Sequence, residues 1–224
     1  MKKAIVLLSG GLDSTTTLYL AKKKKFKCLC LIFNYGQKHK MEIESAERIA
    51  RKTKTPFCVI KVPIPKEASA LTSSNENIIR ASLKKIGQKI PTTYVPARNI
   101  IFLSLGLAWA EAKKCSNIFI GANSIDYSGY PDCRPSFIKS FTKMARLGTK
   151  SGSESKAIKI EAPLLFKNKA QIVKLAKKLK VPLELTWSCY RGGKNPCGTC
   201  ESCLLRSKGF KEAGIKDPLS RKQR

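Results

Sequence analysis

The chain has 224 residues, of which 42% are hydrophobic, and both values are typical of a globular domain with a substantial core. No apolar run reaches the roughly 18–20 residues needed to cross a bilayer, and the apolar start of the chain lacks a signal-peptide cleavage site, so we expect a cytoplasmic protein with no membrane partner. The net charge of +29 would attract polyanions such as RNA, but the lysines are spread along the whole chain, which favours a general lysine bias over a defined nucleic-acid surface.

Strands and helices are predicted to alternate along the chain. The apolar run 3–8 is typical of a buried parallel strand, and a helix is expected over 14–24. The pattern then repeats, with strands predicted at 28–33, 57–62, 117–120 and 158–160 and helices at 41–52, 99–113 and 169–179. This alternation predicts an α/β fold, a doubly wound and mainly parallel sheet of the Rossmann-like kind.

Two polar stretches interrupt the alternation. Residues 63–93 carry three prolines and runs of Ser and Asn, which predicts a long excursion across the surface. Residues 148–156 are small and polar, so we expect a mobile loop there. Irregular segments of such length inside a compact domain are often lids or binding loops.

The segment Ser9-Gly10-Gly11-Leu12-Asp13-Ser14 joins the first strand to the first helix. Its glycines let backbone N–H groups approach an anion, and the helix N-terminus adds the positive end of its dipole, so the segment predicts phosphate binding. The hydroxyls of Ser9, Ser14 and Thr15–Thr17 would add donors, while Asp13 would hold Mg²⁺ or cap the helix. The alternative without function is a glycine turn, and the segment is not the Gly-x4-Gly-Lys-Ser/Thr loop used for γ-phosphate transfer.

Four of the nine cysteines are clustered near the end of the chain. Cys189, Cys197, Cys200 and Cys203 follow the spacing Cys-x7-Cys-x2-Cys-x2-Cys, with Gly198 inside the first short step. Four thiolates with no open position predict a structural Zn²⁺ in a C-terminal knuckle. An iron–sulfur cluster also takes four cysteines, but zinc is preferred because phosphate chemistry needs no electron.

The phosphate-binding segment resembles the signature of the PP-loop (N-type) ATP pyrophosphatases, which bind the pyrophosphate portion of ATP and transfer AMP to an oxygen of the substrate. Four further segments resemble, in chain order, the 7-cyano-7-deazaguanine synthase (QueC) family: 34–39 with Glu42, 94–99, 121–135, and 186–190 with the later cysteines. The resemblance covers nearly the whole chain, and Ala122 departs from it where Val is expected. It implies an ATP-binding α/β domain over 1–185 and a zinc-binding extension over 186–224 packed on the same domain.

The resemblance also implies the reaction. We expect ATP-dependent conversion of 7-carboxy-7-deazaguanine and ammonia into 7-cyano-7-deazaguanine (preQ0), which serves queuosine and archaeosine biosynthesis. Adenylation would turn a poor leaving oxygen into AMP, ammonia would give the amide, and a second activation would allow loss of water to the nitrile. The expected small molecules are ATP with Mg²⁺ and one structural Zn²⁺. No nucleic acid is required, and the family suggests a homodimer.

Site residues follow from the motifs and from their expected places at strand ends, where α/β sheets bind ligands. The residues expected to bind ATP are Leu8, Ser9, Gly10, Gly11, Leu12, Asp13, Ser14, Thr15, Thr16, Thr17, Leu18, Tyr35, Gln37, Arg98 and Asn99. A flat ring would stack on and hydrogen-bond to a loop that supplies Asp126, Tyr127, Tyr130, Asp132 and Arg134, unless its tyrosines only fasten the loop. Asp13, Ser14 and Lys143 are expected to be catalytic, with Arg146 and Lys150 as further phosphate clamps or plain surface residues. His39, the only histidine, is expected in the ATP site or on the surface.

Two other functions remain open. A tRNA-modifying PP-loop enzyme, such as a thiolase or a lysidine-type ligase, would suit the basic charge, although no separate RNA-binding segment is evident. A non-catalytic zinc protein that binds nucleic acid would suit the charge and the cysteines, but it leaves the phosphate-binding segment unexplained.

Overall fold

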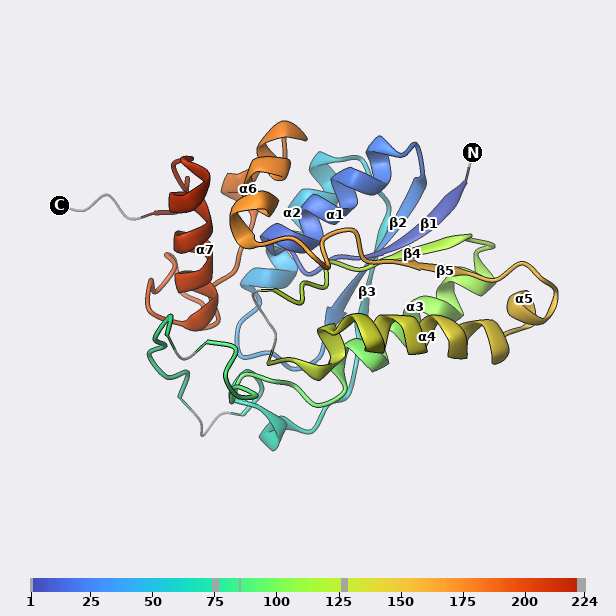
Figure 1. Ribbon diagram of the computed structural model, residues 1–224, viewed down its shortest axis with the longest axis horizontal. Coiled ribbons are helices and arrows are strands. Elements are labelled where there is room, and N and C mark those ends of the chain that lie inside the picture. The colour runs from blue at the N-terminus through green and yellow to red at the C-terminus, as the bar shows by residue number, and fades with distance from the viewer. Residues whose placement is uncertain (1, 74–76, 85, 126–128, 221–224) are drawn as a thin grey trace.

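A parallel sheet forms the centre of the molecule. The computed structural model describes residues 2–73, 77–84, 86–125 and 129–220 (Figure 1). Within them the strands are β1 (Lys3–Leu7), β2 (Lys27–Asn34), β3 (Phe57–Lys61), β4 (Asn117–Phe119) and β5 (Lys159–Glu161). All neighbours pair in parallel in the order β3-β2-β1-β4-β5. From β1 the chain adds β2 and β3 on one side and then crosses over to add β4 and β5 on the other. The strand order therefore reverses between β1 and β4, and such a switch point opens a crevice at the carboxyl ends of the strands.

Helices cover both faces of the sheet (Figure 1). Helices α1 (Leu12–Lys23) and α2 (Met41–Lys52) cover one face, and α3 (Arg98–Ala112) and α4 (Pro135–Leu147) cover the other. At one end of the molecule lie α6 (Lys169–Lys178) and α7 (Glu201–Ala213). The remaining elements are short: α5 (Lys150–Ser153), η1 (Lys66–Ala68), η2 (Pro131–Cys133) and η3 (Leu183–Leu185).

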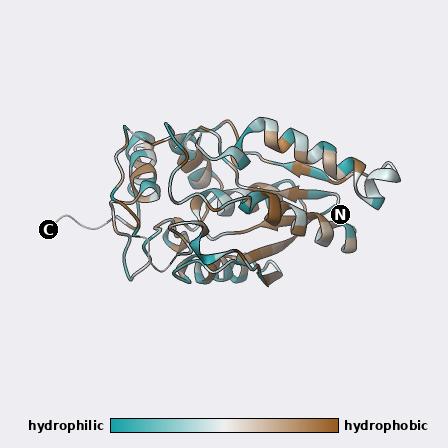
Figure 2. Cartoon of the chain, turned by 90° about the horizontal axis from the view of Figure 1, so that it is seen from below, coloured by the Kyte–Doolittle hydropathy of each residue, from teal (hydrophilic) through white to brown (hydrophobic). Residues whose placement is uncertain are grey.

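Alternation along β1 divides the core into two layers. Ala4 and Val6 belong to the apolar cluster with α1 and α2, whereas Ile5 and Leu7 belong to the cluster with α3 and α4. Successive side chains of a strand point to opposite faces, so a strand buried on both sides must be apolar throughout. The central strands β1 and β2 are accordingly hydrophobic along most of their length (Figure 2).

A third apolar cluster attaches the C-terminal helix. Phe210 of α7 packs with Ile172 and Val173 of α6, and Leu12 from the start of α1 joins the same cluster. A buried ion pair between Arg206 and Asp217, 2.8 Å from Nε to Oδ2, closes the end of the described chain. The C-terminal region therefore shares its core with the helix that follows the first strand, while the domain boundary expected at 185 stays a prediction.

Most predicted elements are confirmed to within two residues, and the helix over 41–52 has the expected bounds. The predicted mobile loop over 148–156 is wrong in part, because Lys150–Ser153 forms one helical turn whose N-cap Thr149 accepts a hydrogen bond from Gly152 N–H. Helices α4 and α7 were not predicted. The excursion over 63–93 is confirmed as irregular in its described part, where η1 is the one regular element.

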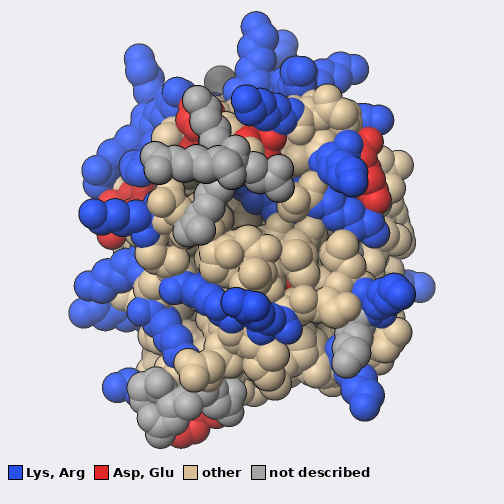
Figure 3. Space-filling model, turned by 90° about the vertical axis from the view of Figure 1, so that its left-hand side faces the viewer, with Lys and Arg blue, Asp and Glu red and all other residues tan. Residues whose placement is uncertain are grey.

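The surface reflects the composition. At the end of the molecule that carries α7, Lys and Arg surround a face with few acidic side chains, and they are distributed around its rim (Figure 3). Within the described residues, no helix combines the length and the apolarity that crossing a membrane requires.

Candidate nucleotide site and cysteine cluster

A cleft opens at the carboxyl ends of β1, β2 and β4, with a volume of about 210 Å³. We call it the phosphate-loop cleft because the segment 9–14 borders it. Its polar lining comes from five separate parts of the chain: Ser9, Asp13 and Ser14; Tyr35, Gln37 and Glu42; Arg98 and Asn99; Asn123 and Tyr130; and Lys169, Ser188, Tyr190, Ser202 and Arg206. The cleft thus lies at the switch point of the sheet, where ligands of α/β folds bind.

Two glycines allow the cleft to form. Gly10 has φ +79°, and a Cβ there would lie 2.5 Å from the carbonyl oxygen of Glu42 and 2.7 Å from the nitrogen of Ala46. A Cβ on Gly121, just past β4, would lie 2.8 Å from the backbone nitrogen of Ser14. Because neither residue has a Cβ, α2 and the end of β4 can both approach the loop backbone closely, and a side chain at either position would clash.

The loop hydroxyls fall into two groups. Ser9 Oγ and Ser14 Oγ lie 3.0 Å apart on the lining of the cleft. Thr15 and Thr16 instead donate to the carbonyls of Gly11 and Leu12, each at 2.7 Å, and the buried Thr17 hydroxyl has no hydrogen-bond partner among the described residues. Hydroxyls in a helix often bond back four residues in this way. Gly10, these three threonines and Leu18 do not line the cleft, so their expected contact with ATP stays a prediction.

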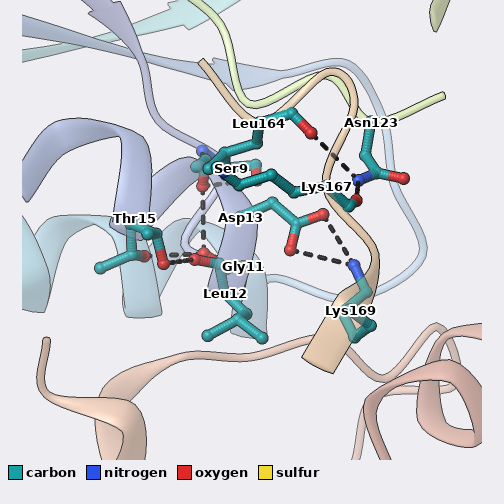
Figure 4. A network of polar contacts seen from close by, with 11 residues as sticks. Ser9, Gly11, Leu12, Asp13, Thr15, Asn123, Leu164, Lys167 and Lys169 are labelled. Atoms are coloured by element: carbon teal, nitrogen blue, oxygen red, sulfur yellow. Dashed lines mark hydrogen bonds and ion pairs between the residues drawn. The ribbon is translucent and has the colours of Figure 1, made fainter. Parts of the chain in front are cut away.

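Asp13 holds a lysine. Its two carboxylate oxygens accept hydrogen bonds from Lys169 Nζ at 3.0 and 2.8 Å (Figure 4). The Asp13 side chain is only 17% exposed and that of Lys169 only 8%, so water screens the ion pair weakly. The N-cap of α1 is Gly11, without a side-chain cap, so the capping role considered for Asp13 is not observed.

Sequence reasoning missed Lys169, which stands at the first position of α6. A cation there opposes the helix dipole, so a lysine directly after an N-cap was the available signal. The N-cap Asn168 forms a capping box with Gln171. The Asn123 amide donates to the carbonyls of Leu164, at 3.2 Å, and of Lys167, which holds the chain that leads into α6 (Figure 4).

One end of the cleft combines aromatic rings with charge. The Arg98 guanidinium lies 6.0 Å from the centre of the Tyr35 ring. Burial raises the pKa of Tyr35 to about 12. Burial also raises the pKa of Glu42, to about 7, against the opposing effect of Arg98. This end of the cleft is therefore a place where charge is poorly hydrated.

Several residues expected to touch ligands have structural partners. The Asp132 carboxylate is buried and accepts from Asn99 N–H at 3.0 Å, and the Asn99 amide donates to the Asp132 carbonyl at 3.1 Å. The Tyr130 hydroxyl lies 2.9 Å from that of Thr93, while its side chain borders the cleft. Gln37 accepts from Tyr35 N–H at 2.9 Å and so shapes the turn after β2.

The other expected residues lie outside the cleft. Arg134, Lys143, Arg146 and Lys150 are exposed and do not line it. Asp126 and Tyr127 lie outside the described residues. His39 belongs neither to the cleft lining nor to the cysteine cluster, and its Nε2 lies 2.8 Å from the Tyr190 carbonyl oxygen. The proposed ligand roles of these residues stay predictions.

Cys189, Cys197, Cys200 and Cys203 converge as their spacing predicts. Their four sulfur atoms all lie within 4.8 Å of one another, and those of Cys197 and Cys203 are 3.9 Å apart. A tetrahedral ion with bonds to sulfur of about 2.3 Å requires sulfur–sulfur distances of about 3.8 Å. Hydrogen bonds from the Cys200 and Cys203 thiols lower the pKa of Cys189. The cluster can therefore hold one metal ion.

The cluster is joined to the phosphate loop. Trp187 N–H donates to the Gly10 carbonyl at 2.9 Å, and its indole N–H donates to the Cys189 carbonyl at 2.9 Å. Helix α7, which begins after Cys200, supplies Ser202 and Arg206 to the cleft lining. A Cβ on Gly209 of α7 would lie 2.7 Å from the Lys169 Cβ.

A parallel sheet with helices on both faces and a cleft at its switch point defines a doubly wound α/β protein, and the strand–loop–helix segment borders the cleft where such folds bind ligands. The family model described as queuosine biosynthesis protein QueC matches residues 3–214, and the chain belongs to that family.

Relatives match along almost the whole chain. The 7-cyano-7-deazaguanine synthase of Coxiella burnetii is 51% identical over 222 residues, covering 97% of each chain. That of Thermoplasma volcanium is 48% identical over 97% of this chain and 90% of its own. Among solved structures, NMN synthetase from Francisella tularensis superposes with a TM-score of 0.50 at 17% identity, covering 96% of this chain and 78% of its own, which is a likeness of fold.

Proposed function

We propose that this chain is a 7-cyano-7-deazaguanine synthase, an ATP-dependent ligase that converts 7-carboxy-7-deazaguanine and ammonia into the 7-cyano compound. The observation that carries the proposal is the near full-length match to enzymes of that name, at 48% and 51% identity. The cleft supports it, since a phosphate site and an aromatic, charged end share one crevice.

The phosphate-loop end would hold ATP. The helix N-terminus at Gly11 and the hydroxyls of Ser9 and Ser14 offer donors to the pyrophosphate portion. The Lys169 ammonium lines the cleft on the same side as Asp13, with which it is ion-paired. When ATP enters, it can turn from Asp13 to a phosphate oxygen and stabilise the charge that develops as pyrophosphate leaves.

Mg²⁺ and Zn²⁺ have suitable residues. The Asp13 carboxylate already binds a cation, the Lys169 ammonium. If Lys169 turns to a phosphate, the same carboxylate oxygens can bind Mg²⁺. Mg²⁺ neutralises phosphate charge when it is bound. The four clustered cysteines would hold Zn²⁺ as a structural ion that fastens α7 to the cleft.

The chemistry runs through two adenylations. The substrate carboxylate attacks the α-phosphorus of ATP, and pyrophosphate leaves. Ammonia then adds to the acyl carbon, and AMP departs with a carboxylate oxygen to leave the amide and a proton. The amide oxygen attacks a second ATP in the same way, and loss of AMP and a proton gives the nitrile. The chain's contribution is to hold the reacting oxygen in line with the α-phosphorus and to exclude water.

The test is turnover by the purified protein. ATP, Mg²⁺, ammonium and 7-carboxy-7-deazaguanine are incubated with it in the absence of RNA, and the products are followed by mass spectrometry. We expect the nitrile and AMP. A requirement for tRNA, or a modified tRNA as the product, would favour the alternative, a tRNA-modifying PP-loop enzyme.

Location and assembly complete the proposal. ATP dependence and nine cysteines that form no disulfide agree with action in the cytoplasm. The homodimer expected from the family stays a prediction that sedimentation of the purified protein would check.

A further inference from the structure

Among the described residues, the cleft lining contains two carboxylates, and their surroundings differ. Asp13 is bound on both oxygens by Lys169. Glu42, in the first turn of α2, also lines the cleft and is half-buried. Throughout the described residues nothing donates a hydrogen bond to the Glu42 carboxylate, and no cation lies within ion-pair distance of it. A poorly hydrated carboxylate without donors is costly, so its presence in a cleft indicates a ligand that supplies them.

The surroundings of Glu42 restrict that ligand. Its backbone carbonyl lies against Gly10, which places the residue beside the phosphate loop. Tyr35, Arg98 and Tyr130 line the same end of the cleft. A flat ring can stack on the aromatic side chains there, while one edge of it meets the carboxylate.

Hydrogen-bonding chemistry selects the edge. Donors supplied by a ligand favour the ionised form of a carboxylate; that form only accepts, and its two oxygens match two adjacent donors. The 2-amino-4-pyrimidinone ring of a deazaguanine presents such a pair, N1–H and the 2-amino group. The corresponding edge of adenine presents one acceptor and one donor, so the adenine of ATP does not match Glu42.

We propose that Glu42 is the specificity-determining residue for the base: its carboxylate accepts hydrogen bonds from N1–H and the 2-amino group of the substrate and so selects guanine-type deazapurines. This inference rests on the proposed function for the identity of the base. It assigns Glu42 to recognition of the ring, and Asp13 and Lys169 to the phosphates.

The test compares Glu42→Gln with two substrates. One is 7-carboxy-7-deazaguanine, and the other is its analogue without the 2-amino group. For the first, Glu42→Gln should lower kcat/KM about 10- to 100-fold, mainly through KM, since this is the worth of a bidentate pair. For the analogue the change should stay below about threefold, and KM for ATP should not change. Glu44→Gln is the matched control, because Glu44 is an exposed carboxylate in the same helical turn.

The outcomes separate this inference from the proposed function. An equal loss on both substrates, with unchanged melting temperature, would overturn the recognition role. Calorimetric binding of both compounds gives a second readout that needs no turnover. Wild-type protein should prefer the 2-amino compound at least about tenfold, and Glu42→Gln should lose that preference. Absence of the preference overturns the inference, whereas preference without turnover supports it and contradicts the proposed reaction.

Discussion

The phosphate loop lines the cleft, whereas the cysteine cluster lies behind the lining residues Ser188, Tyr190 and Ser202, and the two regions are held in different ways. The loop is local in sequence: β1, Gly10, Gly11 and the first turn of α1 are consecutive, and their backbone is confined by close packing. The cluster depends on four thiols that repel one another as thiolates unless a metal ion binds them. The comparison leads us to expect that the loop keeps its conformation without a metal ion, whereas the α7 side of the cleft needs one.

The largest effect is expected from the residues that meet the phosphates. Lys169→Met should lower kcat/KM about 100- to 1000-fold, because it removes a buried cation from the charge that develops in the reaction. Asp13→Ala and Ser14→Ala should likewise abolish turnover while the fold remains. Lys174→Met, on the exposed side of α6, is the control and should retain activity. Normal kinetics in Lys169→Met would remove this residue from the mechanism.

Loss of the metal should act on one side of the cleft. Cys200→Ser should reduce bound Zn²⁺ and destabilise the protein by about 3 kcal/mol, as expected when a structural site is broken. Hydrogen exchange should accelerate in α7 and leave β1 and α1 protected. Cys58→Ser changes a cysteine outside the cluster and serves as the control. Equal loss of protection in both regions would contradict the distinction between them.

Comparing substitutions at two glycines separates the cost of close packing in the loop from the cost of backbone strain. Gly10 and Gly36 both have positive φ, +79° and +86°, but a Cβ meets backbone atoms only at Gly10, and nothing within 4 Å at Gly36. Gly36→Ala should therefore cost only the backbone strain, about 1 kcal/mol. Gly10→Ala should cost about 2–3 kcal/mol more, since a clash with backbone is added. Denaturant unfolding measures both, and equal losses would show that the contact with α2 can relax.

The smallest effect is expected at Lys143. This residue lies on α4, exposed and outside the cleft lining, although the sequence suggested a catalytic role. From this position a lysine interacts with bound phosphates only by a long-range electrostatic attraction that salt screens, so Lys143→Met should change kcat/KM less than about threefold. A larger loss that is insensitive to salt would restore the catalytic role.

The features of the site that are local in sequence could be predicted, and those that depend on distant segments could not. The strand, glycine loop and helix start could be predicted from sequence because the residues that form them are consecutive, and the cysteine cluster could be predicted because its four ligands lie within one short segment. Lys169 could not be placed, because its position depends on Asn123, on the cap of α6 and on Gly209 of α7.

Residue type alone does not separate a polar group that stabilises the fold from one that binds a ligand. Thr15 and Thr16 were predicted to donate to phosphate, but their hydroxyls bond to helix carbonyls. Asp132 was predicted to bind substrate, and it is buried against the backbone at the start of α3. Hydroxyl and carboxylate groups can bond either to the backbone or to a ligand, and the packing around them decides which partner they take.

The central claim is that the cleft transfers AMP to an oxygen of the substrate's carboxylate. It can be tested with 7-carboxy-7-deazaguanine whose two carboxylate oxygens are oxygen-18, incubated with ATP, Mg²⁺ and ammonium. Mass spectrometry of the nucleotides should show two molecules of AMP for each nitrile, each with one labelled oxygen. Label in orthophosphate, or AMP without label, would contradict the account.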